Sequence, residues 1–352
     1  MKFEFYKSID GLRFFSFFAV LLFHLNINGF QLGWAGVSVF FVISGFLITT
    51  ILLKTKEREH YFRNFYIRRS LRIFPIYYAL IIVFTILYLM RDKVFPSDFM
   101  YFMTYTQNVL WVFTDYQSDL SPFLAHTWSL AIEEQFYLLW PFIIFSFRNS
   151  NLIKVSLILI LGAVLFRVVC SYLERSYYIV LLPYHMDLLI MGGVLALIKS
   201  GLTSRIASFF TKYAFLIGLI GCVVCIGVLG YINNDTLNGY QYLDKSHNYI
   251  KNPITANIFF FIGLVSIGLI NLCISQKNAI NTFLSNKIFL HLGKISYGLY
   301  LYHWPIYLIF RKVIHSQFLL LIVCFLVTYI ISFISYKLFE TYFINLKDKY
   351  SY

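Results

Sequence analysis

Apolar runs of about 20 residues recur along almost the whole of this chain, and they constrain its fold more than any other feature. A helix of that length crosses a hydrocarbon core of roughly 30 Å. Membrane-spanning strands would alternate apolar and polar residues, and these runs do not alternate. Composition agrees, because 59% of the residues are hydrophobic and 13% are charged, whereas a soluble domain carries about a quarter charged residues. The sequence therefore predicts an all-α integral membrane protein.

Ten of these runs have the length of a transmembrane helix. They lie at residues 11–28, 34–53, 73–90, 128–147, 152–171, 179–198, 213–231, 253–275, 291–310 and 317–338. Segment 97–113 is also apolar, but it is short and contains Gln107 and Asn108, so it is either an eleventh span or an interfacial segment.

The placement of positive charge decides between these counts, because short cytoplasmic loops are rich in Lys and Arg. Ten spans with a cytoplasmic amino terminus put most Lys and Arg on the inner side, whereas eleven spans divide them almost evenly. We therefore expect a bundle of about ten transmembrane helices with both termini in the cytoplasm. Segment 97–113 is then re-entrant or interfacial.

Residues 1–352 form one predicted membrane domain. No internal repeat is evident, and the two long outer loops, 91–125 and 232–252, are too short to fold separately. The first apolar run continues to Ile27 without a cleavage site, so it is expected to insert as a helix and to remain. The net charge of +13 follows from the placement of Lys and Arg at the inner side and predicts no nucleic-acid partner.

Cysteine and histidine suggest neither redox nor metal chemistry. All five cysteines lie inside apolar runs and are interpreted as small hydrophobic residues. The eight histidines show no paired spacing with carboxylates or cysteines that would build a metal site. We therefore predict no metal.

Ionisable residues at membrane depth are functional candidates, because burying them is unfavourable unless they are paired or hydrated. Arg13 and His24 lie eleven positions apart on the first run, so a helix would place them on one face about 16 Å apart. Arg13 could instead extend to inner headgroups, and His24 could be a packing residue. Their shared face favours a functional pair.

A second cluster, at residues 65–75, contains Arg69 and Arg72. Residues three apart are neighbours on a helix, and two guanidinium groups could hold a phosphate or pyrophosphate. The alternative is an ordinary basic flank that binds anionic lipid.

A third cluster, at residues 126–137, contains adjacent Glu133 and Glu134 at the outer end of the fourth run. These carboxylates could simply favour the positive end of the helix dipole, and Ser129 could act as a helix cap. Glu133 and His24 are, however, assigned to the same outer half of the membrane. A carboxylate beside an imidazole orients it for general-base chemistry.

The remaining ionisable groups point mainly to structure. Arg167 and Asp187 are expected to form a structural pair near His185. His291 and His303 flank an aromatic segment, which is more often packing and interface anchoring than catalysis. Glu340 has no assignable partner.

Five motifs in order on this frame resemble one known family. They are IDGLR at 9–13 followed by His24, GVSVFFVISGFLI at 36–48, Arg69 and Arg72 with Ile73 and Pro75, WSLAIEEQFY at 128–137, and SYGLYLYHWP at 296–305. The sequence resembles the acyltransferase-3 family of integral membrane O-acyltransferases, of the stand-alone type that acetylates bacterial surface polysaccharides.

The resemblance implies transfer of an acetyl group from cytoplasmic acetyl-CoA to a carbohydrate at the outer face of the bacterial inner membrane. It assigns function to Arg13, His24, Arg69 and Arg72. Within the same motifs, the supporting residues are Asp10, Glu134, Tyr137 and His303. Ser38 departs from the family pattern, where an aspartate is frequent. Many relatives carry an appended esterase-like domain. None follows within these 352 residues, so the chain is expected to finish the transfer alone or to pass the group to a separate partner.

We hypothesise that Arg69, Arg72 and Arg13 hold the coenzyme A phosphates, and that His24, oriented by Glu133, deprotonates a sugar hydroxyl that attacks the thioester. An acyl-histidine intermediate is equally compatible with the sequence. The expected acceptor is a glycan or lipid-linked oligosaccharide, with lipopolysaccharide O-antigen first and exopolysaccharide next.

The alternative function is a transporter or flippase for a lipid-linked sugar, which would also bury charges in a helix bundle. Such proteins often contain inverted repeats, and none is evident here. A helical scaffold for other envelope proteins would not explain the shared face of Arg13 and His24.

Overall fold

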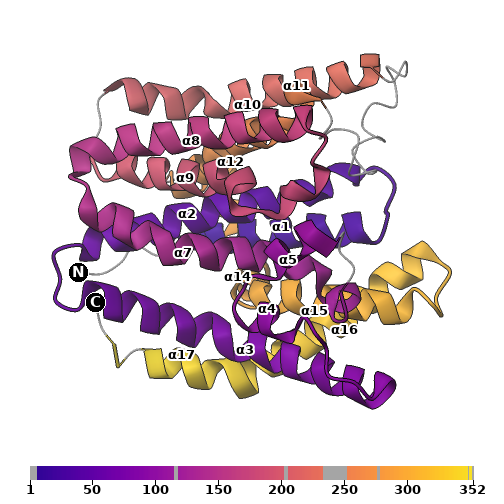
Figure 1. Cartoon of the computed structure of the whole chain (residues 1–352). Coiled ribbons are helices and arrows are strands. Elements are labelled where there is room, and N and C mark those ends of the chain that lie inside the picture. The colour runs from indigo at the N-terminus through magenta and orange to yellow at the C-terminus, as the bar shows by residue number, and fades with distance from the viewer. Residues whose placement is uncertain are drawn as a thin grey trace. The chain divides into compact units, whose positions relative to one another are not determined.

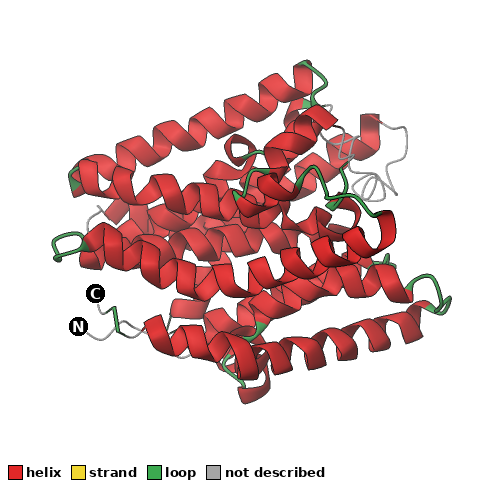
Figure 2. Cartoon of the chain, turned by 60° about the horizontal axis from the view of Figure 1, so that its bottom comes forward, coloured by secondary structure: helices red, strands yellow, loops and turns green. Residues whose placement is uncertain are grey.

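The computed structural model describes residues 6–114, 118–201, 205–232, 252–275, 278–347 and 349–350. Throughout these ranges the regular structure is helical and no strand occurs, as Figure 2 shows. The all-α prediction is therefore confirmed for the described chain. The predicted outer loop 232–252 lies outside the described residues except at its two ends.

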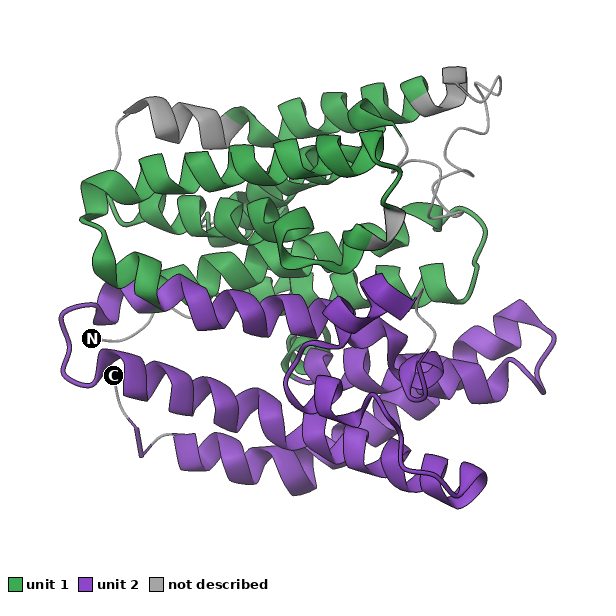
Figure 3. Ribbon diagram, viewed as in Figure 1, with its two compact units in different colours: residues 1–51, 142–294 green, residues 52–141, 295–352 purple. Residues whose placement is uncertain are grey.

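The chain groups into two compact units (Figure 3). Unit 1 comprises Met1–Ile51 and Phe142–Lys294, and unit 2 comprises Leu52–Pro141 and Ile295–Tyr352. The boundaries fall inside two helices, α2 (Ala35–Thr55) and α7 (Trp128–Ser146), and directly before Ile295.

Unit 1 is a stack of helices that contains most of α2 (Figure 1). Its other elements are α1 (Lys7–His24), η1 (Gln31–Trp34), α8 (Asn149–Tyr172), η3 (Ser176–Val180), α9 (Leu182–Lys199), α10 (Arg205–Ile232), α11 (Pro253–Ala256), α12 (Ile258–Ile274), α13 (Ala279–Leu284) and α14 (Lys287–Lys294). Helix α12 packs against α10, α9 and α1, α8 packs along α9, and α1 also contacts α13 and α14.

Glycine permits a close contact between α2 and α9 in unit 1. A Cβ atom added to Gly45 of α2 would lie 1.7 Å from the Leu189 carbonyl oxygen of α9, and one added to Gly192 of α9 would lie 2.0 Å from the Val42 carbonyl oxygen of α2. Small residues allow helix backbones to approach in this way inside membranes, where van der Waals packing drives association. Gly45, the second glycine of segment 36–48, thus has a packing role.

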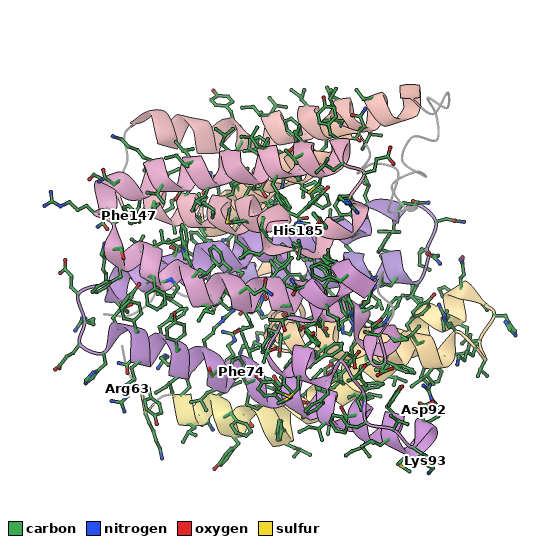
Figure 4. The ribbon with its side chains drawn as sticks, in the orientation of Figure 1. Arg63, Phe74, Asp92, Lys93, Phe147 and His185 are labelled. Atoms are coloured by element: carbon green, nitrogen blue, oxygen red, sulfur yellow. The ribbon has the colours of Figure 1, made fainter. Side chains whose placement is uncertain are left out.

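Unit 2 is built around the long helix α3 (Tyr61–Asp92), with Arg63 near one end and Lys93 just beyond the other (Figure 4). Its other elements are α4 (Phe99–Met103), α5 (Gln107–Thr114), α6 (Ser121–Leu124), η2 (Ala125–Thr127), most of α7, α15 (Ser296–Phe310), α16 (Gln317–Ser335), η5 (Tyr336–Glu340, a π-helical turn) and α17 (Thr341–Lys347). Helix α15 packs on α16 and α6, and α3 packs on α4 and α17.

Six helical stretches in the described chain are long and apolar enough to cross a membrane. They are Gln31–Thr55, Tyr61–Asp92, Asn149–Tyr172, Tyr178–Lys199, Pro253–Ile274 and Gln317–Lys347. The chain is thus a multi-pass membrane protein. A shorter apolar helix covers Tyr213–Val228.

The predicted count of ten spans is not confirmed, and neither is the cytoplasmic placement of the termini. The runs 11–28, 128–147 and 291–310 do form helices, but α1 carries Asp10 and Arg13, and α7 carries two glutamates. The run 291–310 is interrupted at Ile295, which leaves α15 with 15 residues.

Segment 97–113 does not form a span. It folds into α4, with 5 residues, and α5, with 8 residues, separated by a turn. At 1.5 Å per residue neither helix can cross the hydrocarbon core. Gln107 is fully buried and donates from Nε2 to the Thr127 carbonyl oxygen at 3.1 Å. Gln107 thus binds the backbone of η2 (Ala125–Thr127), directly before α7.

Candidate functional site

In unit 1, Asp10, Arg13 and His24 all lie on α1, an unbroken helix from Lys7 to His24. The spacing therefore gives the expected separation of about 16 Å along one face between Arg13 and His24. Arg13 Nη1 lies 3.8 Å from Asp10 Oδ1, with side chains that are 16% and 14% exposed. His24 is the last residue of α1, half-buried beside the Phe23 ring. The carboxylate, the guanidinium and the imidazole thus lie along one helix.

The backbone at Asp10 is held against α14. A Cβ atom added to Gly293 would lie 2.1 Å from the Asp10 carbonyl oxygen, so the two helices are in direct contact there. This contact fixes the turn of α1 from which Asp10 reaches Arg13.

The Arg167–Asp187 pair also lies in unit 1 and is fully buried, with both side chains 0% exposed. Arg167 donates from Nη1 and Nη2 to the two Asp187 carboxylate oxygens at 2.9 and 2.5 Å. Its Nε donates to Asn257 Oδ1 at 3.1 Å. The His185 ring contacts the ring of Tyr184, whose carbonyl oxygen accepts from Arg167 Nη1 at 2.6 Å, and it lies among the helices of the unit (Figure 4). The expected structural ion pair is confirmed.

In unit 2, Arg69 of α3 packs against Tyr137 of α7. The guanidinium carbon lies 4.0 Å from the centre of the Tyr137 ring, and Nη2 donates a hydrogen bond to the Tyr137 hydroxyl. Tyr137 is buried and Arg69 is half-buried. A cation over an aromatic face is attracted by the ring quadrupole, so Tyr137 fixes the plane of the guanidinium.

Two carboxyl groups on α7 lie within electrostatic range of the same guanidinium. Glu134 and Glu133 both attract Arg69, and Glu134 is also an electrostatic neighbour of Tyr297 on α15. Glu134 Oε1 and Arg69 Nε are buried polar atoms without a hydrogen-bond partner. The cluster therefore contains one acceptor and one donor with spare hydrogen-bonding capacity.

Arg72 has different surroundings from Arg69, although the two are three residues apart on α3. Its side chain is exposed, and it attracts Glu340 on the π-helical turn η5. Glu340 Oε1 accepts a hydrogen bond from Ser335 Oγ at 3.3 Å, and Ser335 Oγ accepts one from the Tyr302 hydroxyl at 3.0 Å. Glu340, for which the sequence offered no partner, thus belongs to a polar chain joining α15, α16 and η5.

Hydrogen bonds join the segments 128–137 and 296–305. The Tyr300 hydroxyl lies 2.6 Å from Ser129 Oγ and donates to the His126 carbonyl oxygen at 3.0 Å. His126 Nε2 lies 3.0 Å from the Leu301 carbonyl oxygen, and His303 Nδ1 lies 2.5 Å from the Tyr300 carbonyl oxygen. Ser129 therefore has a tertiary role in place of the capping role considered for it.

The turn between α4 and α5 carries a residue that the sequence gave no reason to select. Tyr105 is 5% exposed and adopts a left-handed backbone conformation, with φ of 54°. Its ring stacks on Tyr77 with centroids 4.3 Å apart, and its carbonyl oxygen accepts from Gln135 Nε2 at 2.8 Å. Aromatic content alone could not single it out, because the chain has 28 tyrosines.

The predicted site residues therefore fall into two groups. Asp10, Arg13 and His24 lie in unit 1, and the residues in unit 2 are Arg69, Arg72, Glu133, Glu134, Tyr137 and His303. Contact between His24 and Glu133 would join the two groups, and it stays a prediction. Within the described residues, no group of three or more His, Cys, Asp or Glu side chains is placed to hold a metal ion.

A protein-family model described as an acyltransferase domain, of the acyltransferase-3 type, matches residues 6–337. The O-acetyltransferase OatA of Staphylococcus aureus is 30% identical over 364 residues, which cover 95% of this chain and 56% of that protein. The putative peptidoglycan O-acetyltransferase YrhL of Bacillus subtilis is 28% identical over 362 residues, covering 95% and 54%.

Peptidoglycan O-acetyltransferase OatA of Listeria monocytogenes is 38% identical over 148 residues, covering 39% of this chain and 24% of that protein. The chain thus spans about half the length of the first two relatives. No solved structure matches it.

Proposed function

The chain belongs to the acyltransferase-3 family of membrane O-acyltransferases, and we propose that it moves an acetyl group onto a hydroxyl of a cell-envelope glycan at the bacterial cytoplasmic membrane. The observation that carries this proposal is the extent of the match. The family model covers residues 6–337, and two relatives named as O-acetyltransferases align with 95% of the chain.

Peptidoglycan is the acceptor that the relatives support best. The names of YrhL and of the Listeria protein specify peptidoglycan, and no relative quoted above is named for lipopolysaccharide or exopolysaccharide, which the sequence had suggested first. The chain spans about half of the longer relatives, and we propose peptidoglycan as its acceptor from their names.

The proposed donor is acetyl-CoA. The hydroxyl oxygen of the acceptor attacks the thioester carbonyl carbon, the carbon–sulfur bond breaks, and the hydroxyl proton ends on the coenzyme A sulfur. His24 is the proposed base for that proton, in line with the usual role of a near-neutral imidazole. Arg72, exposed on α3, and Arg13 are the proposed ligands for coenzyme A phosphates, since a guanidinium group suits phosphate geometry.

The function is tested by measuring O-acetyl groups on purified peptidoglycan by mass spectrometry before and after mild alkali. The strains compared carry the intact gene, a deletion, His24→Ala, or His315→Ala, a matched control because His315 is exposed in the loop after α15. We expect acetyl groups to disappear in the deletion and in His24→Ala and to persist in His315→Ala.

Full acetylation in the deletion strain would reject peptidoglycan as the acceptor. Full acetylation in His24→Ala, with loss in the deletion, would reject His24 as the base. The transporter alternative predicts no covalent acetyl group on any envelope glycan in the intact strain.

A further inference from the structure

Three side chains of unit 2 bring unsatisfied polar atoms to one cluster. The Tyr105 hydroxyl, Glu134 Oε1 and Arg69 Nε are all buried and have no hydrogen-bond partner. Glu134 is the electrostatic neighbour shared by Tyr105 and Arg69. A buried polar atom left unpaired is unfavourable, so an unpaired carboxyl oxygen together with two unpaired groups that interact electrostatically with that carboxyl group favours a ligand that pairs with all three.

Each of the three groups is held in place by contacts of its own. Arg69 lies over the Tyr137 ring and donates to the Tyr137 hydroxyl. Tyr105 stacks on Tyr77, and its carbonyl oxygen is held by Gln135 Nε2. Gln135 is the residue next to Glu134 on α7, so one hydrogen bond ties the turn of Tyr105 to the turn of Glu134.

The backbone of Tyr105 adds a second observation. Its φ of 54° is in the left-handed region, which is unfavourable for a bulky residue and is maintained only where the surroundings impose it. Here the stack on Tyr77 and the bond from Gln135 impose it. The result is a tyrosine ring held in one position, with a hydroxyl that interacts electrostatically with Glu134.

The carboxyl groups of the cluster favour a neutral ligand over a phosphate. Glu134 and Glu133 lie within electrostatic range of Arg69 and already offset its positive charge, which weakens its attraction for an anion. A neutral group that both accepts and donates hydrogen bonds has no such penalty. Arg69 Nε supplies a donor, the Tyr105 hydroxyl supplies a donor, and Glu134 Oε1 supplies an acceptor.

We propose that Arg69, Tyr105 and Glu134 form a recognition site for a secondary amide. The amide oxygen accepts from Arg69 Nε and the Tyr105 hydroxyl, and the amide N–H donates to Glu134. The inference rests on the proposed function and deepens it, because two of its reactants carry this group: the pantetheine arm of coenzyme A and the N-acetyl group of an amino sugar.

The test measures binding to the purified full-length chain in lipid nanodiscs by titration calorimetry. One pair of probes is pantetheine and cysteamine, which lacks the amides. The other pair is chitobiose and cellobiose, which lacks the N-acetyl groups. We expect one amide probe to bind at least tenfold more tightly than its amide-free counterpart, and the identity of that probe assigns the site to the donor or to the acceptor.

Variants connect that binding to the three side chains. Tyr105→Phe keeps the ring stack and removes one hydroxyl, and it should weaken binding of the amide probe about tenfold, the effect of one hydrogen bond. Glu134→Gln should weaken it at least as much. The matched control is Tyr101→Phe, at an exposed tyrosine one turn before Tyr105, which should bind like the parent chain.

Two results would overturn the inference. The first is equal affinity for amide and amide-free probes in both pairs, and the second is unchanged affinity in Tyr105→Phe with an unchanged melting temperature. Binding of the amide probe does not require acetyl transfer, so the amide site and the proposed function can be rejected independently of each other. Amide binding in a chain that acetylates no glycan would reject the proposed function alone.

Discussion

The guanidinium carbon of Arg69 lies 4.0 Å from the centre of the Tyr137 ring, and the same guanidinium donates to the Tyr137 hydroxyl. One tyrosine thus supplies both an aromatic face and a hydrogen-bond acceptor to a residue that would otherwise bring a charge into the interior of unit 2. This relationship explains why two arginines three residues apart on α3 differ, since Arg72 is exposed and Arg69 is not.

Replacing Tyr137 by Phe should destabilise the protein by about 1–3 kcal/mol, because a buried Arg69 N–H loses its acceptor while the ring remains. The measurement is denaturant unfolding in mixed micelles. Tyr342→Phe is the control, since that side chain is 68% exposed. Equal stability of the two variants would show that the hydroxyl contributes nothing.

Asp187→Asn should be destabilising by about 3–5 kcal/mol, because it leaves the Arg167 charge buried without its counter-ion. The Arg91–Asp92 pair is the control, with side chains 61% and 36% exposed, and Asp92→Asn should change the unfolding free energy by less than about 1 kcal/mol. Shifts of the same size in the two variants would contradict the structural role of the buried pair.

Tyr300→Phe and Ser129→Ala should interact in a double-mutant cycle, because their hydroxyl groups lie 2.6 Å apart. We expect a coupling energy of about 0.5–3 kcal/mol in the unfolding free energy. Combining Ser129→Ala with Tyr66→Phe, whose hydroxyl bonds to the Leu138 carbonyl oxygen, should give additive effects. Additivity in both cycles would mean that segments 128–137 and 296–305 are not joined through these hydroxyls.

Gly45→Ala should greatly reduce the yield of folded protein, because the new Cβ atom would lie 1.7 Å from the Leu189 carbonyl oxygen. Gly162→Ala meets no atom within 4 Å and should be neutral or stabilising by about 0.5–1 kcal/mol through its helix propensity. Fluorescence-detected size-exclusion chromatography measures both yields. A normal yield for Gly45→Ala would be incompatible with the contact of α2 and α9.

The loop that holds Asp119 should lose stability in acid. The pKa of Asp119 is lowered from 3.8, chiefly because the Ser97 backbone N–H donates to its carboxylate, with help from the Ser97 and Tyr88 hydroxyls. A lowered folded-state pKa gives stability that is present above the unfolded pKa and is lost as pH falls through the folded one.

The melting temperature of the parent chain should therefore exceed that of Asp119→Asn at pH 6, and the difference should disappear as the pH falls below about 4. A difference that persists at pH 2 would exclude the carboxylate as its source.

The sequence alone determined the features that depend on local chemistry. Apolar runs predicted helices in a membrane, and the polar pair Gln107–Asn108 with the distribution of charge excluded a span at 97–113, where the structure has two short helices. The charges of Arg167 and Asp187, at membrane depth, each required an oppositely charged partner, and the two residues form an ion pair with each other. The five motifs led to the family that the comparison then showed.

Other features were decided only by the tertiary structure. The run 291–310 is interrupted at Ile295, Ser129 bonds to Tyr300, and Tyr105 stacks on Tyr77 while its carbonyl oxygen accepts from Gln135. Hydropathy and helix propensity are properties of neighbouring residues, so they can be read along the chain. Which side chains of separate helices meet depends on the register and rotation at which those helices pack, and that is fixed by contacts such as the one at Gly45, between residues far apart in the sequence.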